Sequence, residues 1–246
     1  MHTPADKLTP TPVRKELLEK LVYANRILYD QGVVDGLGHV SVRHEQSPEH
    51  FLLSCNRAPA LVSQEDIVCY DLDGNDVENT GKRSYLERFI HSEIYRARPE
   101  VMAVIHSHSP SVIPFGVTGH RLRPVFHMAG FLGEGTALFD SQDTVGDSDL
   151  LIRTPELGRA MARAMGTCSC ILMRGHGSTV VAGSIEQAVY RAIYTEVNAQ
   201  LQLQAKGLGD VRYLTPAEAE MAAQTNDTQI QRSWDLWCRR VDRTGV

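Results

Sequence analysis

Residues 101–108 read Val-Met-Ala-Val-Ile-His-Ser-His, a short apolar run that ends in two histidines. A run of this length and composition predicts a buried strand. Alternate side chains of a strand share a face, so we expect His106 and His108 to point the same way. Two neighbouring imidazoles at a strand end could supply half of a metal site. They could also be polar residues where the strand meets solvent.

The composition is that of an ordinary globular protein. The chain has 246 residues, of which 42% are hydrophobic and 22% are charged. This length suits one large domain. We expect a flexible arm, rich in proline and threonine, over residues 1–12 and a single domain over residues 13–246.

The charge and hydropathy patterns argue against two kinds of partner. The formal net charge is -5 and the basic residues are scattered, so no nucleic-acid partner is expected. No apolar stretch is long enough to span a membrane, and the first residues lack the apolar core of a signal peptide. Five cysteines without a framework spacing predict packed thiols, Cys168 and Cys170 among them, in the reducing cytoplasm.

Helical and strand patterns follow one another without a clear linker. Helices are expected over residues 13–29 and 84–98 and from Thr154, Ser184 and Thr215 onward, and strands at residues 40–42, 51–54, 67–72, 101–105 and 170–173. Short strands mixed with helices predict an α/β sandwich in which helices cover a mixed sheet. Trp234 and Trp237 lie three residues apart on the last expected helix, where such a pair usually packs in the core.

Three further residues could complete a metal site. Glu87 and His91 lie four residues apart, on one face of an expected helix. Glu87 is also the fourth residue of a pattern that begins at Ser84, where a glutamate can instead cap the helix backbone. His176 lies between two glycines after a strand, where a tight bend could expose an imidazole or simply form a turn.

Taken together, these residues favour a catalytic metal. Three histidines and one carboxylate at the ends of strands and helices suit Zn²⁺, and Mn²⁺, Fe²⁺ and Co²⁺ accept the same ligands. Three protein ligands and one exchangeable position are typical of a catalytic site. We therefore expect His106, His108 and His176 to bind the metal, with Glu87 closing the shell or moving a proton.

Four segments of the chain together resemble the class II aldolase/adducin head family. They are Gly38-His39-Val40-Ser41, Glu87 with His91, His106-Ser107-His108 and Gly175-His176-Gly177, and the resemblance spans roughly residues 15–205. It implies a three-layer α/β/α sandwich around a mixed, largely antiparallel sheet. It also implies a homotetramer with active sites at subunit interfaces, and a divalent metal held by the residues named above.

Departures from the family pattern bear on the substrate. Sugar-phosphate aldolases of this family carry small phosphate-binding groups where this chain has His39, Asn56-Arg57-Ala58 and Tyr85-Leu86. A phosphate cradle needs small donors and free backbone N–H groups, so a phosphorylated substrate is not expected. These segments and Phe126-His127-Met128 resemble the decarboxylase branch of the family. Its members act on dicarboxylates such as 3,4-dihydroxyphthalate or 3-hydroxy-2-methylpyridine-4,5-dicarboxylate.

The expected reaction is loss of CO₂ from an ortho-hydroxy aromatic or pyridine dicarboxylate, a step of aromatic catabolism. Glu87 is expected to carry the proton and His91 to orient it. Arg57 suits a substrate carboxylate, although it could be an ordinary surface arginine. The other candidate substrate contacts are His39, Ser84 and His127. For the last of these a structural role is the alternative.

Two other functions stay open at this point. An aldolase that cleaves a non-phosphorylated hydroxy-keto acid would use the same metal site. A non-enzymatic assembly module, as in adducin heads, is less favoured because all four candidate ligand positions are filled. A dinucleotide site is excluded, since Gly36-Leu37-Gly38 lacks a third glycine at the needed position.

Overall fold

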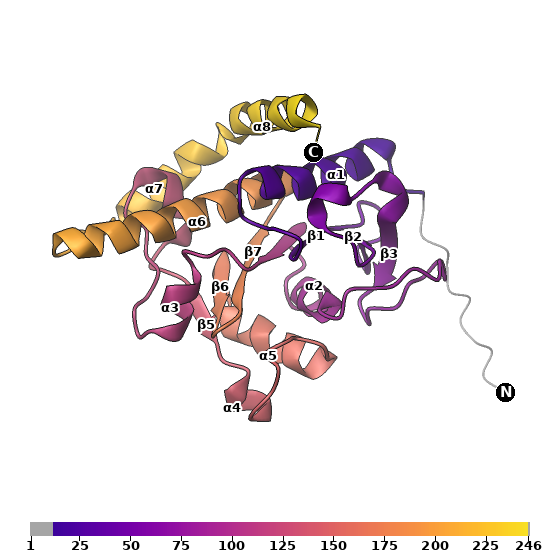
Figure 1. The fold of residues 1–246 in the computed structure, drawn as a ribbon, viewed down its shortest axis with the longest axis horizontal. Coiled ribbons are helices and arrows are strands. Elements are labelled where there is room, and N and C mark those ends of the chain that lie inside the picture. The colour runs from indigo at the N-terminus through magenta and orange to yellow at the C-terminus, as the bar shows by residue number, and fades with distance from the viewer. Residues whose placement is uncertain (1–11, 246) are drawn as a thin grey trace.

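A seven-stranded sheet runs through the centre of the molecule, in the order β3-β2-β1-β4-β7-β6-β5 (Figure 1). The computed structural model describes residues 12–245, so the arm expected over residues 1–12 lies almost wholly outside the described residues. The strands are β1 (His39–Arg43), β2 (His50–Ser54), β3 (Ile67–Asp71), β4 (Ala103–Ser107), β5 (Ala137–Phe139), β6 (Cys170–Met173) and β7 (Gly177–Ala182). Neighbouring strands are antiparallel except for β5 and β6, which confirms a mixed, largely antiparallel sheet.

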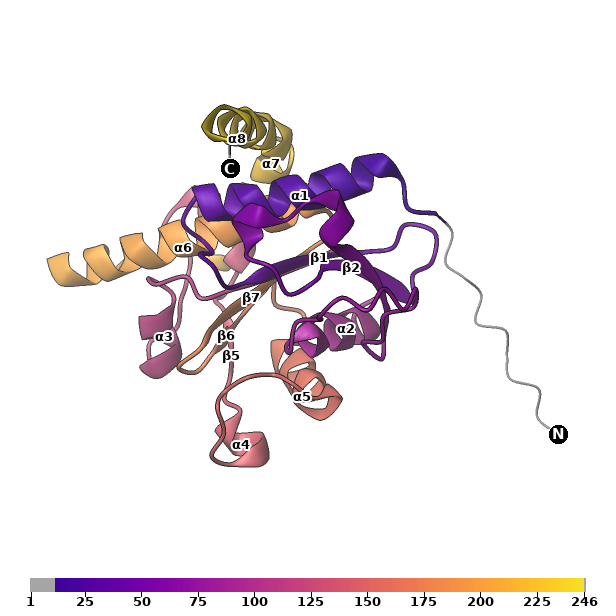
Figure 2. The ribbon, with the colours of Figure 1, turned by 45° about the vertical axis from the view of Figure 1, so that its right-hand side comes forward.

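Helices cover both faces of this sheet and produce three layers (Figure 2). α1 (Lys15–Asp30) and α6 (Ile185–Leu208) lie on one face, and α2 (Arg88–Ala97) and α5 (Pro155–Met165) lie on the other. Separate clusters of buried apolar side chains fill the two spaces between sheet and helices. α8 (Ile230–Thr244) lies outside α1 and α6 (Figure 1). The expected three-layer sandwich is confirmed.

β4 is central because its side chains are buried on both faces of the sheet. Ala103 and Ile105 belong to the apolar cluster under α1 and α6, whereas Val104 belongs to the cluster under α2 and α5. A continuous apolar run is what a strand covered on both sides requires. The alternation also directs His106, two residues after Val104, to the α2 side of the sheet.

The remaining elements are short or peripheral. They are α3 (Ile113–Val117), α4 (Gln142–Val145), α7 (Pro216–Asp227) and three 3₁₀ turns over Pro59–Leu61, Gln64–Asp66 and His127–Leu132. The side chains of Thr154, Ser184 and Thr215 accept hydrogen bonds from the first turns of α5, α6 and α7, so these three helix starts are confirmed. Within residues 12–245, no helix has the length and apolar character needed to cross a membrane.

The expected helix start at Ser84 is wrong, because α2 begins at Arg88. The Ser84 hydroxyl accepts a hydrogen bond from Tyr70 Oη at 2.9 Å, and the Glu87 carboxylate accepts one from the Ile152 amide at 2.9 Å. Neither side chain is therefore free to cap the helix.

The sequence patterns also differ from the structure in the last helix and in two strands. The last helix is two helices, because the chain turns between α7 and α8. Strands β5 and β7 were not anticipated. Trp234 and Trp237 are 5% and 7% exposed and belong to the main core cluster, as expected for a packing pair.

The close approach of α2 and α5 depends on a glycine. A Cβ atom on Gly158 of α5 would lie 2.4 Å from the Phe89 carbonyl oxygen in α2. We expect Gly158→Ala to destabilise the fold by about 2 kcal/mol, although alanine ordinarily favours a helix. The measurement is the midpoint of urea unfolding.

Gly207→Ala is the matched control, since Gly207 is also helical and nothing lies within 4 Å of its Cβ position. This variant should be neutral or slightly stabilising. Equal midpoints for the two variants would contradict the close contact between α2 and α5.

Candidate metal centre

Four potential ligand side chains meet on the α2 side of the sheet. His106 is the penultimate residue of β4, His108 follows that strand, His176 lies in the turn between β6 and β7, and Glu87 immediately precedes α2. His106 and His108 point the same way, as the strand pattern predicted. Residues from three separate parts of the chain therefore converge at one point.

The distances between ligand atoms suit one divalent ion. His108 Nε2 lies 3.2 Å from His106 Nε2 and 3.1 Å from His176 Nε2. Glu87 Oε2 lies 3.7 Å from His106 Nε2 and 3.5 Å from His176 Nε2, and all four ligand atoms lie within 4.8 Å of one another. Bonds of about 2 Å to a tetrahedral zinc ion would place its ligands roughly 3.3 Å apart. The cluster could hold such an ion.

Hydrogen bonds behind the cluster leave the correct atoms facing inward. His176 Nδ1 donates to the Leu150 carbonyl oxygen at 3.0 Å, which leaves the lone pair of Nε2 for a ligand. Glu87 Oε1 accepts from the Ile152 amide, which leaves Oε2 directed at the histidines. Outer partners of this kind set the tautomer and orientation of metal ligands.

No sequence pattern pointed to the segment that supplies these two backbone groups. Leu150 has a φ of 66°, in the left-handed region that residues with a Cβ seldom adopt. In this segment the Leu150 carbonyl faces His176 and the Ile152 amide faces Glu87.

The glycines on either side of His176 have separate purposes. Gly175 has a φ of 63°, a conformation that costs glycine little. A Cβ atom on Gly177 would lie 2.1 Å from the Ser107 carbonyl oxygen, so any other residue would push β7 away from β4. The tight bend expected around His176 is confirmed.

The charges within the cluster are mutually stabilised. Burial opposes ionisation of Glu87, but its hydrogen bond to His176 and the charges of His106 and His176 outweigh burial and lower its pKa to about 2. Burial lowers the pKa of both His106 and His108. Burial acts the same way on His176, but the Glu87 carboxylate outweighs it and raises the pKa of His176. The cluster therefore joins one carboxylate to two imidazoles whose pKa values are lowered and one whose pKa is raised.

The cluster opens into a cavity of about 290 Å³. The cavity is lined by Gly36, Leu37, Gly38, His39, Asn56, Tyr85, Leu86, Glu87, His108 and Leu151. Its walls are largely apolar, and its titratable groups are His39, Tyr85 and two members of the cluster, Glu87 and His108. A mostly apolar cavity with a few convergent polar groups is typical of a small-molecule site.

His91 was expected to orient Glu87, but it makes its hydrogen bonds to other residues. His91 Nε2 lies 2.6 Å from His39 Nδ1, and His91 Nδ1 lies 2.6 Å from Ser41 Oγ. No hydrogen bond joins His91 to Glu87 in the described part of the chain, because both ring nitrogens of His91 face other partners. Burial lowers the pKa of His91 to about 3.

Three other expected substrate contacts do not line this cavity. Arg57 Nε donates to the Leu61 carbonyl oxygen at 2.8 Å and lies 3.3 Å from the Asp66 carboxylate. Ser84 is engaged by Tyr70, and His127 is exposed at the start of its 3₁₀ turn. Within one chain, only His39 of the four expected substrate contacts reaches the cavity.

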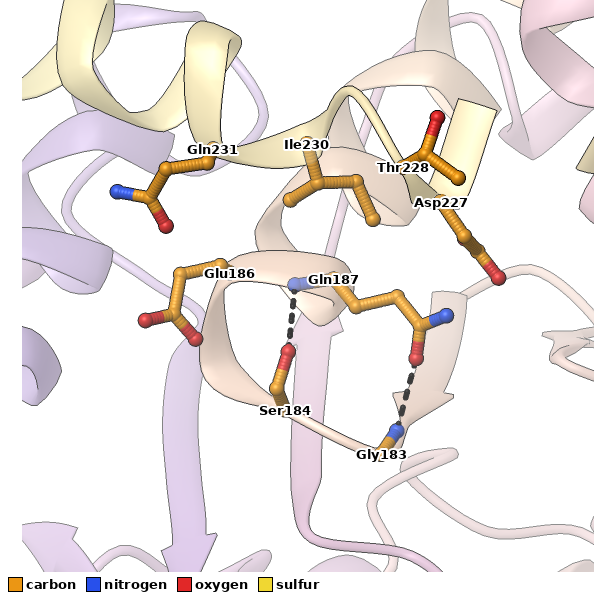
Figure 3. A pocket seen from close by; sticks show the side chains of 8 residues that line it. All are labelled: Gly183, Ser184, Glu186, Gln187, Asp227, Thr228, Ile230 and Gln231. Atoms are coloured by element: carbon orange, nitrogen blue, oxygen red, sulfur yellow. Dashed lines mark hydrogen bonds between the residues drawn. The ribbon is translucent and has the colours of Figure 1, made fainter. Parts of the chain in front are cut away.

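A larger hollow of about 500 Å³ lies where α6 begins, beside the junction of α7 and α8 (Figure 3). The backbone N–H of Gln187 donates to Ser184 Oγ, and its side-chain Oε1 accepts from the Gly183 N–H, so these polar groups at the helix start are satisfied. Its Glu186 carboxylate is paired with Lys20 at 3.0 Å. This hollow shares no residue with the histidine cluster and holds no comparable group of ligands.

The fold and the cluster define a class II aldolase-like protein. A solved structure of L-fuculose 1-phosphate aldolase from Glaciozyma antarctica matches with a TM-score of 0.76 at 25% identity, over 96% of this chain and 95% of that one. The chain belongs to the Class II Aldolase and Adducin N-terminal domain family, whose model matches residues 19–203. The expected family is confirmed.

Curated relatives narrow the resemblance to decarboxylases. Decarboxylase tropJ of Talaromyces stipitatus is 40% identical over 89% of this chain and 92% of its own length. The 3,4-dihydroxyphthalate decarboxylase of Arthrobacter keyseri is 36% identical over 78% of this chain and 79% of its own length. These relatives confirm the prediction of a carbon–carbon lyase from the decarboxylase branch.

The raised pKa of His176 predicts how metal affinity depends on pH. A metal needs the neutral imidazole, so Zn²⁺ must displace a proton from His176 below its pKa, which lies above 6.5. The pKa values of His106 and His108 are lowered by burial, so these two imidazoles lose their protons at lower pH than His176 does. The dissociation constant for Zn²⁺ should rise about tenfold for each pH unit below this pKa. Competition with a chelator of known affinity measures it.

A threefold steeper dependence would show that all three histidines titrate together and would contradict this assignment. His176→Ala should weaken Zn²⁺ binding at least 100-fold and abolish the pH dependence. His120→Ala is the control, because His120 is exposed and lies outside the cluster.

Proposed function

We propose that this protein is a divalent-metal-dependent decarboxylase of an ortho-hydroxy aromatic or pyridine dicarboxylate, such as 3,4-dihydroxyphthalate. The observation that carries the proposal is the cluster of His106, His108, His176 and Glu87 at one side of an apolar-walled cavity. The decarboxylase relatives support the reaction, and the cavity supports a flat ring as substrate.

The cavity walls favour a ring over a sugar phosphate. Tyr85, Leu86 and Leu37 present bulky side chains to the cavity, where a phosphate would need small donors and free backbone amides. Apolar and aromatic walls suit the faces of a planar ring, and a few polar groups at the edge would orient it.

His106, His108 and His176 would hold a divalent ion, with Glu87 as the fourth ligand or the proton carrier. When bound, such an ion withdraws charge from the oxygen beside the breaking carbon–carbon bond and so stabilises the electron pair that CO₂ leaves behind. Zn²⁺ and Mn²⁺ are the first candidates, and Fe²⁺ and Co²⁺ suit the same ligands.

Glu87 is the proposed catalytic group. Its pKa of about 2 makes it a carboxylate at neutral pH, so it acts first as a base. It takes the proton of the ring hydroxyl and returns it to the ring carbon from which CO₂ departs. The Ile152 amide holds Oε1, which leaves Oε2 facing His106 and His176.

Arg57 is proposed to bind the carboxylate that stays on the ring. It follows Asn56, a lining residue of the cavity, and its terminal nitrogens make no hydrogen bond within residues 12–245. A guanidinium can grip a carboxylate with two parallel hydrogen bonds. We also propose that His91 positions other groups and that Ser84 and His127 contact the substrate. The imidazole of His127 is exposed, so it can reach the substrate of a neighbouring subunit.

We also propose a cytoplasmic homotetramer whose cavities lie at subunit interfaces. Leu37 and Leu86 line the cavity yet are 66% and 48% exposed, which suits coverage by a second copy of the chain. The five cysteines are free thiols, as expected in a reducing compartment. The mass in solution, measured by light scattering, tests the assembly.

The first test is CO₂ release by protein supplied with Mn²⁺ or Zn²⁺. The panel contains 3,4-dihydroxyphthalate, 3-hydroxy-2-methylpyridine-4,5-dicarboxylate and a non-phosphorylated hydroxy-keto acid. We expect metal-dependent CO₂ release from one of the ring compounds. Cleavage of the hydroxy-keto acid alone would make the protein an aldolase instead.

Glu87→Gln separates proton transfer from metal binding. The variant should keep its metal on three histidines but lower kcat by roughly 100- to 10,000-fold, because an amide cannot carry the proton. Metal content per chain and the rate of CO₂ release measure the two effects. Glu186→Gln, remote from the cluster, is the control. Retained activity in Glu87→Gln would remove Glu87 from its proposed role.

A further inference from the structure

A chain of four hydrogen-bonding side chains runs from the cavity into the core. His39 of β1 lies at the cavity, His91 of α2 contacts it, and Ser41 and Tyr95 follow. The contacts are 2.6 Å from His39 Nδ1 to His91 Nε2, 2.6 Å from His91 Nδ1 to Ser41 Oγ, and 2.8 Å from Ser41 Oγ to Tyr95 Oη. His91 and Ser41 are fully buried, and Tyr95 is 1% exposed.

Each proton in this chain has only one place to go. The Tyr95 hydroxyl is buried and has Ser41 Oγ as its side-chain partner, so it donates to Ser41. Ser41 must then give its own proton to His91 Nδ1, its other partner. The reverse order would leave the Tyr95 proton buried without an acceptor, which is costly.

The order of donors settles the state of the two imidazoles. His91 accepts at Nδ1 and therefore carries its proton on Nε2, which it donates to His39 Nδ1. His39 in turn carries its proton on Nε2. That nitrogen has no partner among residues 12–245, and His39 is one of the residues that line the cavity.

We propose that Tyr95, Ser41 and His91 hold His39 in the single tautomer that presents an Nε2–H donor to the cavity, where it binds a carboxylate oxygen of the substrate. The role in substrate binding rests on the proposed function, whereas the tautomer does not. His39 shares the cavity with Glu87 and His108, so its donor would set the orientation of a dicarboxylate relative to the cluster. His91, Ser41 and Tyr95 are positioning residues.

The tautomer is tested by NMR on Zn²⁺-loaded protein with ¹⁵N-labelled histidine. Long-range ¹H–¹⁵N spectra distinguish a protonated ring nitrogen from a bare one, and the His39 signals are those lost in His39→Gln. We expect His39 to show a protonated Nε2 and a bare Nδ1. The opposite assignment would overturn the proposal.

Variants of the hydrogen-bond chain make the test specific. Ser41→Ala removes the donor to His91 Nδ1, so His39 should become a mixture of both tautomers. Tyr95→Phe removes the donor that commits the Ser41 proton to His91, so His39 should also lose its single tautomer, although less completely than in Ser41→Ala. Ser92→Ala is the matched control, because Ser92 is buried in the same helix as His91 and its hydroxyl has no hydrogen-bond partner among the described residues. An unchanged His39 tautomer in Ser41→Ala would contradict the proposed chain of hydrogen bonds.

Binding of phthalate and catechol, measured by calorimetry, tests the role of the donor. His39→Leu should weaken phthalate binding at least tenfold, the usual effect of losing a hydrogen bond to a charged group. His39→Gln, which keeps an N–H donor, should retain most of the affinity. Catechol has no carboxylate, so its binding should change little in either variant. Equal losses of affinity for phthalate and catechol would contradict a contact between His39 and the substrate carboxylate.

These measurements fail separately from the proposed reaction. An absence of CO₂ release with the expected tautomer and phthalate binding would reject the decarboxylase but keep the role of His39. CO₂ release by a protein whose His39 Nε2 carries no proton would support the decarboxylase but reject the role of His39.

Discussion

The pairing of β4 with its two neighbours is the constraint on which the rest of the site depends. β1 places His39 directly opposite His106, and β7 places Thr179 opposite His106 from the other side. A slip of one residue in either register would turn these side chains to the opposite face of the sheet. Burial of β4 on both faces makes such a slip costly, because each apolar side chain of the strand would leave its cluster.

Around that strand, the buried polar groups form two connected systems. One gathers a carboxylate and three imidazoles, and the Leu150 carbonyl and the Ile152 amide orient two of these ligands. The other runs from His39 into the core. A buried polar group without a partner is destabilising, so both systems must be complete to be tolerated. The same hydrogen bonds that avoid this penalty orient the ligand atoms and the donor toward the cavity.

Local patterns predicted more of the architecture than of its details. The apolar run before His106 indicated the central strand, and side-chain caps indicated the starts of α5, α6 and α7. Strand β7 was missed because its pairing with β4 lies far away in the sequence. The start of α2 was placed too early, since the Ser84 and Glu87 side chains are drawn to partners outside the helix.

The sequence by itself determined the family, the sheet-and-helix architecture and the identity of the four candidate ligands, because spacing and residue type carry that information locally. Only the tertiary structure decided which polar residues meet. It paired His91 with His39 instead of Glu87, and it held the Arg57 Nε away from the cavity. Helix periodicity shows which residues share a face, but the neighbour of that face depends on packing between distant segments. For the same reason, the backbone groups near Leu150 that orient the cluster left no signal in the chain.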